Sequence, residues 1–202
     1  MHRTIEPKIL YLGTPVVLIS TMNADATANL APMSSAWWLG KSCVLGLGTR
    51  GQTFENLARE RECVLNLPSA AMVAAVDKLA LTTGKNPVPD YKQKMNFRYV
   101  ADKFALAGLT ADLSEIVAAP RVRECPIQLE ARVENIRQLG TTEEHHAAVE
   151  VRVIRTHVDE NLLNHEKRHH IDPDKWNPLI MNFLEFYGLG ANAHSSRLAK
   201  VF

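Results

Sequence analysis

The alternation of apolar and polar positions predicts a chain built mainly from β-strands. The first apolar run, residues 16–22, is rich in β-branched side chains, and four turn-prone residues, 23–26, separate it from a second run at 27–39. Two such runs joined by a short polar break predict a β-hairpin. A third run at 43–49 and a fourth at 63–67 are also strand-like. We therefore expect the first third of the chain to form neighbouring strands of one sheet.

Helical periodicity is confined to short segments. The spacing predicts a helix over residues 54–61 with Thr53 as its N-cap, and a second helix that Ser69 caps and that extends to Ala80. Residues 102–107 predict one or two helical turns. Between these helices, residues 82–93 are rich in Gly, Pro, Lys and Asn, and a loop of this length in a compact domain is often functional or mobile.

The second half of the chain predicts a meander of half-buried strands. Residues 127–134 and 147–157 alternate apolar with polar side chains, which is the period of a strand with one buried face. A meander with helices outside it favours a closed or partly closed antiparallel barrel. At 202 residues the chain is long enough for one domain, 1–202. Its segment 178–202 is too apolar and aromatic to be loose, so we expect it to pack on the barrel or on a second subunit.

Composition narrows the class of protein. The net charge of +1 gives no basic footprint for nucleic acid, and no apolar run approaches the ~20 residues of a membrane span. The N-terminal residues lack the apolar core of a signal peptide. Cys43, Cys63 and Cys125 lie singly in apolar runs, which predicts buried reduced thiols. We therefore expect a cytoplasmic protein with neither a nucleic-acid partner nor a membrane partner.

One motif match points to a dinucleotide-binding fold. Residues 46–51 match GxGxxG between a predicted strand and a predicted helix. That fold needs a βαβ unit and an acidic residue about 20 positions further on, whereas a hairpin precedes this motif and residues 66–70 hold no acid. The glycines are better explained as barrel residues at which the backbone passes close to a ligand.

A second match, HExxH at residues 165–169, is typical of zinc hydrolases. On a helix, His165 and His169 would lie one turn apart on the same face. Zinc needs a third protein ligand, for which Glu185 is the candidate acid, and two cationic residues stand between the histidines. We therefore assign no metal, and metal-dependent hydrolysis through His165 and His169 stays an alternative.

A third group, of hydroxyl and basic side chains, predicts an anion site. Ser34 and Ser35 lie in one strand-like run, and the neighbouring run ends at residues 49–53, where a helix starts. Helix-start N–H groups, hydroxyls and a guanidinium are donors that bind phosphate. Turn hydroxyls and a helix cap would explain the same residues without a ligand. The apolar wall beside both groups, with Trp37 and Trp38, favours a nucleotide-like cofactor.

Several segments, in their order and spacing, resemble the flavin reductase-like family, and together they extend over nearly the whole chain. The segments that carry the resemblance are residues 13–21, 28–35, 43–47, 62–68, 119–121, 124–130 and 186–190. The family consists of FMN-binding split barrels. The resemblance therefore implies a mainly β fold, a split β-barrel that is antiparallel and Greek-key-like, with a few peripheral helices.

The resemblance also implies a cofactor and its ligands. FMN would lie at the interface of a homodimer, with residues 33–36 along its isoalloxazine ring and residues 49–53 at its phosphate. The implied cofactor-binding residues are Asn29, Met33, Ser34, Ser35, Ala36, Thr49, Arg50, Gln52 and Thr53. Spacing matches His146 to a histidine near the nicotinamide site of some flavin reductases. Glu144 and His145 precede it where those proteins have glycine and aspartate, so a surface histidine at a strand start is the alternative.

Two functions follow from the resemblance. In the first, the protein is an oxidoreductase of the flavin reductase type, in which NADH or NADPH passes a hydride to FMN and the reduced flavin serves a small-molecule or protein acceptor. The chain then supplies positioning and donors that stabilise negative charge on the reduced ring, with backbone N–H groups near Ser35 and Ala36 as candidates. In the second, the protein is a flavoredoxin-like, FMN-binding electron carrier that a protein partner reduces and that has no nicotinamide site.

Overall fold

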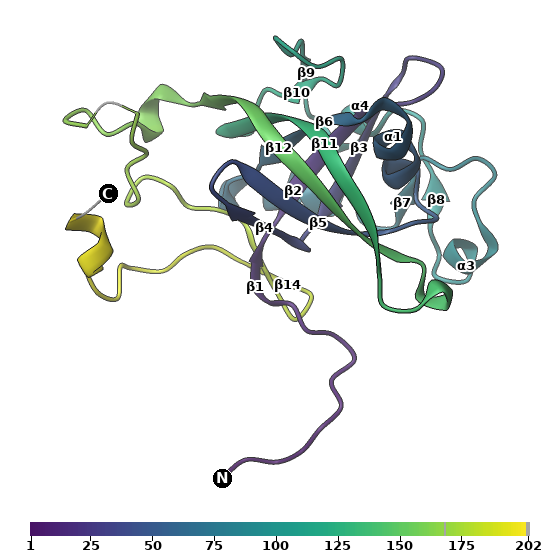
Figure 1. Ribbon diagram of the computed structural model, residues 1–202, viewed down its shortest axis with the longest axis horizontal. Helices are drawn as coiled ribbons and strands as arrows, with labels where there is room; N and C mark the ends of the chain where they lie inside the picture. The colour runs from purple at the N-terminus through teal and green to yellow at the C-terminus, as the bar shows by residue number, and fades with distance from the viewer. Residues whose placement is uncertain (168, 201–202) are drawn as a thin grey trace.

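The main feature of the fold is a seven-stranded antiparallel sheet with the strand order β3-β2-β6-β11-β12-β5-β4 (Figure 1). We describe it from a computed structural model, which gives the structure of residues 1–167 and 169–200. The strands are β2 Val17–Met22, β3 Ala28–Met33, β4 Ala36–Leu39, β5 Ser42–Gly48, β6 Glu62–Leu67, β11 Ile127–Leu139 and β12 His146–Val158. The prediction of a mainly β, antiparallel fold is confirmed.

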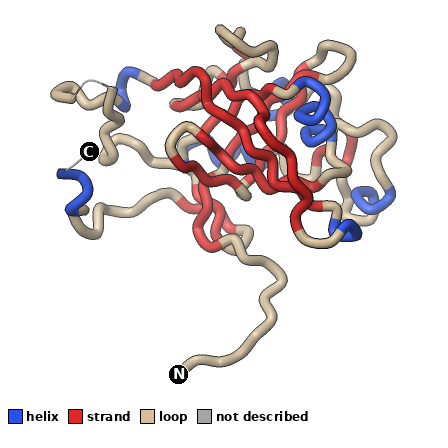
Figure 2. The backbone as a smooth tube through the Cα atoms, in the orientation of Figure 1, coloured by secondary structure: helices blue, strands red, loops and turns tan. Residues whose placement is uncertain are grey.

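The sheet closes on itself because its two edge strands are consecutive in the chain. Only Ser34 and Ser35 join β3 to β4, and a connection of that length bridges roughly 10 Å. The backbone N–H of Gly46 in β5 donates to the carbonyl oxygen of Ser35 at 2.7 Å. The two edges therefore lie close together, and the sheet forms a split barrel (Figure 2).

The run predicted at 27–39 consists of two strands rather than one. The predicted hairpin is present, since β2 and β3 pair with Val17 opposite Met33 and Met22 opposite Ala28. The chain then crosses to the other edge of the sheet, although the apolar pattern continues without a break. An alternating pattern shows which residues are buried, but it does not show which strand they pair with.

Side-chain alternation along the strands fills the core of the barrel. In β5, for example, Cys43, Leu45 and Leu47 are buried in the core and the residues between them are half-buried. A second apolar core, with Leu18 and Leu30 among its members, packs beneath the peripheral helices. All three cysteines are buried, as predicted, and burial raises the pKa of the Cys43 thiol to about 12.

Short helices flank the barrel (Figure 2). They are α1 Gln52–Glu60, α2 Val73–Asp77, α3 Asp90–Gln93 and α4 Lys103–Ala107, with the 3-10 helices η1 Ala70–Met72, η2 Thr142–Glu144, η3 Glu160–Leu162 and η4 Arg197–Lys200. The helix predicted at 54–61 begins two residues earlier, and its N-cap is Gly51 rather than Thr53. The Thr53 hydroxyl instead accepts a hydrogen bond from Asn29 Nδ2 at 3.1 Å, because a neighbouring strand offers it a donor.

The long loop predicted at 82–93 is part of a larger excursion with structure of its own. Strands β7 Thr82–Thr83 and β8 Arg98–Tyr99 pair in parallel and fix its two ends. The segment between them, residues 84–97, is called the lid below, and it carries α3 (Figure 1). A further short pair, β9 Ala111–Asp112 and β10 Arg121–Val122, lies in the connection from α4 to β11.

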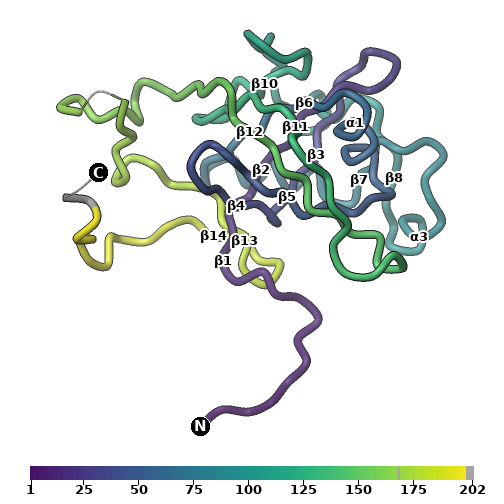
Figure 3. The backbone as a smooth tube through the Cα atoms, in the orientation of Figure 1, coloured from purple at the N-terminus to yellow at the C-terminus, as the bar shows by residue number. Residues whose placement is uncertain are grey.

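Segments from near the two ends of the chain share a small sheet beside the barrel. Strand β1 Leu12–Pro15 pairs with β13 Ile180–Asn182, which pairs with β14 Glu185–Tyr187. The predicted packing of 178–202 therefore involves its first part, where Leu179 is buried, whereas residues 188–198 are exposed and 201–202 lie outside the described residues. Residues 1–10 form an arm that leads away from the barrel (Figure 3). Within the described ranges, no helix is long and apolar enough to cross a membrane.

Candidate functional site

A cavity of about 400 Å³ lies between the barrel and the lid. A volume of this size is typical of a small-molecule site. Its walls come from the end of β3, the β5–α1 connection, the segment after α2, the lid and the start of α4. Its polar lining residues are Gln52, Thr53, Thr82, Thr83, Tyr91, Lys92 and Lys103. Its larger apolar lining residues are Met33, Leu47, Phe54, Leu79, Leu81 and Phe97.

Lys103 is buried in this cavity without a partner of opposite charge. Its side chain donates to Asn29 Oδ1 at 3.0 Å, and the residue is 4% exposed. The described residues that line the cavity include no aspartate or glutamate. Burial, together with the charge of Lys92, lowers the pKa of Lys103 to about 8. Since an unpaired buried cation is costly, the position is suited to an anionic ligand that would supply the missing charge.

The other polar groups beside Lys103 can all donate hydrogen bonds. Lys92 donates to Thr83 Oγ1 at 3.1 Å, and burial, with the charge of Lys85, lowers the pKa of Lys92. The hydroxyl oxygens of Thr83 and Thr53 each accept a hydrogen bond, so each keeps its own hydrogen to donate. We call Thr53, Thr83, Lys92 and Lys103 the donor cluster. Its natural complement is a group that only accepts, such as a phosphate dianion.

The N-terminus of α1 adds backbone donors to the same cavity. Gly51 has no side chain to cap the helix. The first hydrogen bond of the helix runs from the N–H of Glu55 to the carbonyl oxygen of Gly51, at 3.2 Å. The N–H groups of Gln52, Thr53 and Phe54 therefore precede the intrahelical ladder, and all three residues line the cavity. Such N–H groups bind anions at helix N-termini.

Four of the nine predicted cofactor-binding residues lie at this cavity. Met33, Gln52 and Thr53 line it. Asn29 lies directly behind the donor cluster, because it donates to Thr53 and accepts from Lys103. The structure thus brings together residues from β3, α1 and α4 that are far apart in the sequence.

Three further predicted residues, Ser34, Ser35 and Ala36, follow Met33 beside the cavity, outside its lining. The Ser35 hydroxyl donates to the Tyr11 hydroxyl at 3.2 Å. Hydrogen-bonded and non-hydrogen-bonded pairs alternate along an antiparallel ladder. The N–H of Gly46 donates to the Ser35 carbonyl, so the next pair, Ala36 and Leu45, is not hydrogen-bonded. The N–H of Ala36 therefore points away from β5. Strand β4 is an edge strand of the seven-stranded sheet, so this N–H faces outward from the sheet.

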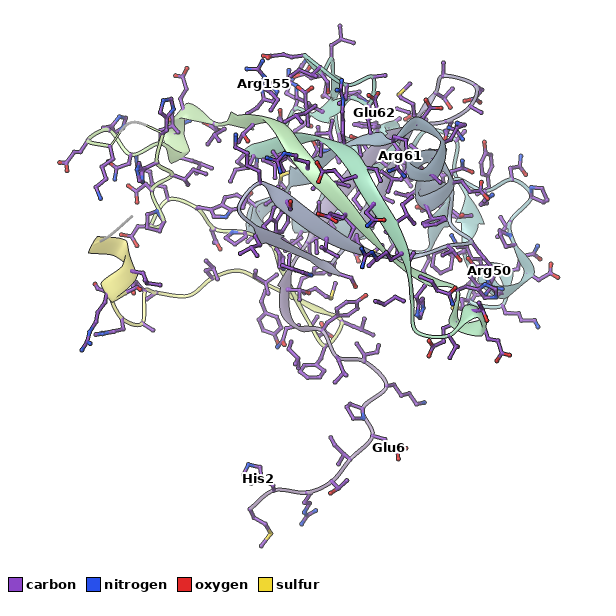
Figure 4. The ribbon with its side chains drawn as sticks, in the orientation of Figure 1. His2, Glu6, Arg50, Arg61, Glu62 and Arg155 are labelled. Atoms are coloured by element: carbon purple, nitrogen blue, oxygen red, sulfur yellow. The ribbon has the colours of Figure 1, made fainter. Side chains whose placement is uncertain are left out.

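The remaining two, Thr49 and Arg50, line a neighbouring hollow on the other side of Tyr91. The Arg50 guanidinium carbon lies 4.1 Å from the centre of the Tyr91 ring, which is a cation–π contact. Thr49 donates from its hydroxyl to the His145 carbonyl at 3.1 Å. Arg50 lies at the same end of the molecule as α3 (Figure 4). This geometry therefore disfavours direct contact between Arg50 and a phosphate in the cavity.

His146 is exposed and is the first residue of β12. It lies opposite Gly48 in the ladder, and Gly48 lines the cavity. The backbone N–H of Thr49 donates to the carbonyl of the preceding residue, His145, at 2.7 Å. The histidine is thus placed beside the strand end that borders the cavity, and its role toward nicotinamide stays a prediction.

Most of the donor cluster, namely Lys103, Lys92 and Thr83, was not predicted from the sequence. A signal for Lys103 was present, because Lys103 and Ala107 are one helical turn apart and share the buried face of α4 with Phe104. A lysine on the apolar face of a short helix, in its first turn, opposes both burial and the helix dipole. Lys92 and Thr83 had no such signal, since only the fold of the lid brings them to the cavity.

The GxGxxG motif does not open a βαβ unit. Strands β5 and β6, which flank α1, are separated in the sheet by β11 and β12, and all of these pairs are antiparallel. At Gly46 the close neighbour is the β3–β4 connection, because a Cβ atom there would lie 2.9 Å from Ser35 Cβ. Gly48 lines the cavity, as expected for a glycine beside a ligand.

The HExxH match does not lie on a helix. His165 belongs to an exposed bend and His169 to an exposed turn, while Arg168 lies outside the described residues. The two imidazoles therefore lack the helical spacing that the zinc motif needs. Across the described residues, no group of three or more His, Cys, Asp or Glu side chains could hold a metal ion.

The fold and the cavity define the class of protein, a split β-barrel with a cavity whose polar lining is rich in hydrogen-bond donors. The family model described as "Flavin reductase like domain" matches residues 10–187, and the chain belongs to this family of flavin-binding proteins. The family resemblance and the split-barrel fold predicted from the sequence are therefore confirmed.

Comparison with individual proteins extends the similarity over nearly the whole chain. "Uncharacterized protein YdfE" of Bacillus subtilis (strain 168) is 42% identical over 188 residues, which are 93% of this chain and 89% of that protein. The flavoredoxin of Desulfovibrio vulgaris (Miyazaki F) has a TM-score of 0.80 at 23% identity, over 99% of this chain and 100% of its own. Nitrilotriacetate monooxygenase component B from Bacillus cereus has a TM-score of 0.76 at 21% identity, over 96% of this chain and 99% of its own. At these identities the two structures show a shared fold.

Proposed function

We propose that the protein is an FMN-binding oxidoreductase of the flavin reductase type, which holds the phosphate of FMN at the donor cluster. The observation that carries this proposal is the burial of Lys103 in a cavity without a carboxylate. A phosphate dianion would neutralise Lys103 and Lys92, and the N-terminus of α1 would add backbone hydrogen bonds.

The rest of the cavity fits the remainder of a flavin mononucleotide. Apolar side chains of Met33, Leu47 and Phe97 line it beyond the donor cluster. When bound, the flavin would supply the redox chemistry, taking a hydride from NADH or NADPH and passing electrons to an acceptor. The part of the chain is to orient the ring and to offer donors, among which the outward N–H of Ala36 is suited to negative charge on the ring.

A homodimer is part of the same proposal. Large apolar side chains are exposed on β4, on β1, which contacts β4, and on or near β14. They are Leu12, Trp37, Leu39, Phe183, Leu184 and Tyr187. Exposed apolar clusters of this kind mark protein interfaces. Because β4 begins at Ala36, a second copy on this surface would cover the edge along which we place the flavin ring.

An electron carrier of the flavoredoxin type is the second candidate, and the lid is the observation that favours it. Tyr91, Lys92 and Phe97 of the lid line the cavity, so the lid covers part of the site from solvent. A covered flavin would be reduced by a protein partner more readily than by a free nicotinamide nucleotide. In this case the residues that bind FMN are the same, and only the source of electrons differs.

Anaerobic stopped-flow mixing tests the proposed reaction. The purified protein, loaded with FMN, is mixed with NADH or NADPH while the visible absorption band of the flavin is followed. Bleaching of the band with either nucleotide is the expected result. Absence of bleaching with both, combined with reduction by a protein partner, would decide for the electron carrier. If NADH or NADPH bleaches the band, His146→Ala should raise the KM for that nucleotide without changing FMN affinity, because we place His146 beside the nicotinamide.

A further inference from the structure

The donor cluster is separated from a second, larger chamber by a thin partition. This outer chamber, of about 690 Å³, is lined by the turn after β2, the start of the lid and the segment before α4. Gln52 and Gly84 line both spaces. Asn29 lines the outer chamber while its amide bonds to Thr53 and Lys103 of the donor cluster. We call Asn29, Gln52 and Gly84 the wall.

The wall is closely packed. A Cβ atom added to Gly84 would lie 2.7 Å from Asn29 Oδ1, which is shorter than real contacts of a Cβ atom, and 3.1 Å from Gln52 Cγ, which is a tight contact. The backbone of the lid therefore packs against both amide side chains, and a methyl group at Gly84 would fit only if they shifted. A ligand cannot pass from the cavity to the outer chamber while these contacts hold.

Buried hydrogen bonds hold the wall in place. Asn29 Nδ2 donates to Thr21 Oγ1 at 3.3 Å and to Thr53 Oγ1 at 3.1 Å. Gln52 Nε2 donates to Asn56 Oδ1 at 2.9 Å, and the fully buried Asn56 also donates to Thr21 at 3.0 Å. Asn29 cannot swing aside without leaving the buried groups of Thr53 and Lys103 without this partner, which is costly. Asn56 Oδ1 also accepts from Arg59 at 3.1 Å, so Asn56 keeps a donor if the half-buried Gln52 moves.

The lid limits the cavity at a second boundary. Tyr91 lines both the cavity and the surface hollow outside it, and the Arg50 guanidinium lies 4.1 Å from the centre of its ring. This stacking holds the tyrosine between the two spaces. The charged end of a ligand at the donor cluster is thus bounded by the wall and by Tyr91.

We propose that the wall makes the site selective for FMN, which ends in a phosphate monoester, over FAD, which continues through a diphosphate into adenosine. The proposal rests on the function proposed above. The phosphate of FMN can end against Lys103 and Asn29. The second phosphate and the adenosine of FAD would have to pass through the wall to reach the outer chamber. Gln52 is then a specificity-determining residue, because its side chain fills the space beside Gly84.

Titration of the apoprotein with FMN, FAD and riboflavin, followed by flavin fluorescence, tests this selectivity. We expect FMN to bind at least about tenfold more tightly than FAD. Gln52→Ala shortens the wall and should reduce that preference by about tenfold. Gln138→Ala is the matched control, because Gln138 is exposed and is not among the residues that line the cavity or the outer chamber. Gln52→Asn, which is shorter by one methylene, should shift the preference in the same direction if Gln52→Ala does not fold.

The outcomes separate this proposal from the proposed function. Equal affinities for FMN and FAD in the unchanged protein would overturn the selectivity and leave flavin binding intact. A preference for FMN that survives in both Gln52 variants would overturn the role of the wall. Failure of all three flavins to bind would contradict the proposed function itself, and the selectivity with it.

Discussion

In the proposed site, Lys103 is a side chain whose role toward a ligand comes at the expense of the stability of the fold. It occupies the first turn of α4, where the helix dipole opposes a positive charge, and its ammonium is buried 3.0 Å from a neutral amide oxygen of Asn29. Both effects destabilise the protein without a ligand. The attraction between the ammonium and a phosphate dianion would offset both costs, so we attribute the position of Lys103 to the proposed binding.

The unfolding free energy of the apoprotein should depend on pH through Lys103. The folded pKa is about 8, below the ordinary 10.5, so above pH 8 the folded state releases a proton that the unfolded state keeps. The unfolding free energy of the wild type minus that of Lys103→Met should therefore rise between pH 8 and 10.5, by a total of about 3 kcal/mol. Below pH 8 this difference should be constant.

Urea unfolding of the wild type and of Lys103→Met at several pH values measures this difference. Lys78→Met is the control, because Lys78 is exposed and lies outside the cavity lining. Parallel stability profiles for the wild type and Lys103→Met would show that the ammonium is not buried as described.

Hydroxyl and amide residues were easier to predict than the cationic ones. Gln52 and Thr53 follow a strand and start a helix, and that local pattern is visible in the sequence. Lys92 reaches the cavity only because β7 and β8 pair and bring the lid over the barrel. A residue placed by tertiary structure in this way leaves no periodic signal.

At the scale of elements, the site is the meeting point of α1 and the lid. The uncapped N-terminus of α1 supplies backbone donors, and the lid supplies Lys92 and Tyr91. The lid is attached to the rest of the site through the contact of Arg50 with Tyr91 and the bond from Lys92 to Thr83. These contacts link the order of the lid to the shape of the cavity.

Arg50→Ala should weaken FMN binding only through the lid. A cation–π contact at an exposed site is worth about 0.5–1 kcal/mol, which corresponds to a two- to fivefold loss of affinity. Arg98→Ala is a matched control, since Arg98 is also exposed and lies just after the lid. Isothermal titration with FMN measures both. A loss well above tenfold for Arg50→Ala would mean that the guanidinium contacts the phosphate directly, against its placement on Tyr91.

Strands were predicted better than the connections between them. The predicted strands at residues 127–134 and 147–157 lie within β11 and β12. Their prediction succeeded because alternation of apolar and polar residues with a period of two indicates a half-buried strand directly. The division of 27–39 into β3 and β4 could not be predicted, since pairing with β2 on one edge and β5 on the other leaves the same apolar pattern. The start of α1 was off by two residues, because the Thr53 hydroxyl bonds to a neighbouring strand, whereas Ser69 is an N-cap as predicted.

At the scale of the whole molecule, the surface suggests that one chain is not the complete unit. The edge strand β4 exposes Trp37, which is 57% exposed, next to the small sheet that contains β1. The arm of residues 1–10 and the segment 188–198 both start at the small sheet of β1, β13 and β14 and lead away from it in different directions (Figure 3). We propose that a second copy covers this surface and completes the flavin site.

Trp37→Lys should convert the proposed dimer to a monomer and weaken FMN binding. A lysine in place of an exposed tryptophan adds a charge that would be buried in the interface, which is unfavourable without a partner. Light scattering after size exclusion gives the mass, with Leu113→Lys, another exposed apolar residue on a distant loop, as the control. A wild-type protein that is monomeric at micromolar concentration would contradict the proposed dimer.

The central claim is that the donor cluster binds the phosphate of FMN, and one titration tests it most directly. Apoprotein at pH 7 is titrated with FMN and with riboflavin, which lacks the phosphate, in the wild type, Lys103→Met and Lys78→Met. We predict that Lys103→Met weakens FMN by about 10- to 150-fold, since a hydrogen bond to a charged group is worth about 1.5–3 kcal/mol, and leaves riboflavin unchanged. Unchanged FMN affinity in Lys103→Met, or an equal loss for both flavins, would contradict the account.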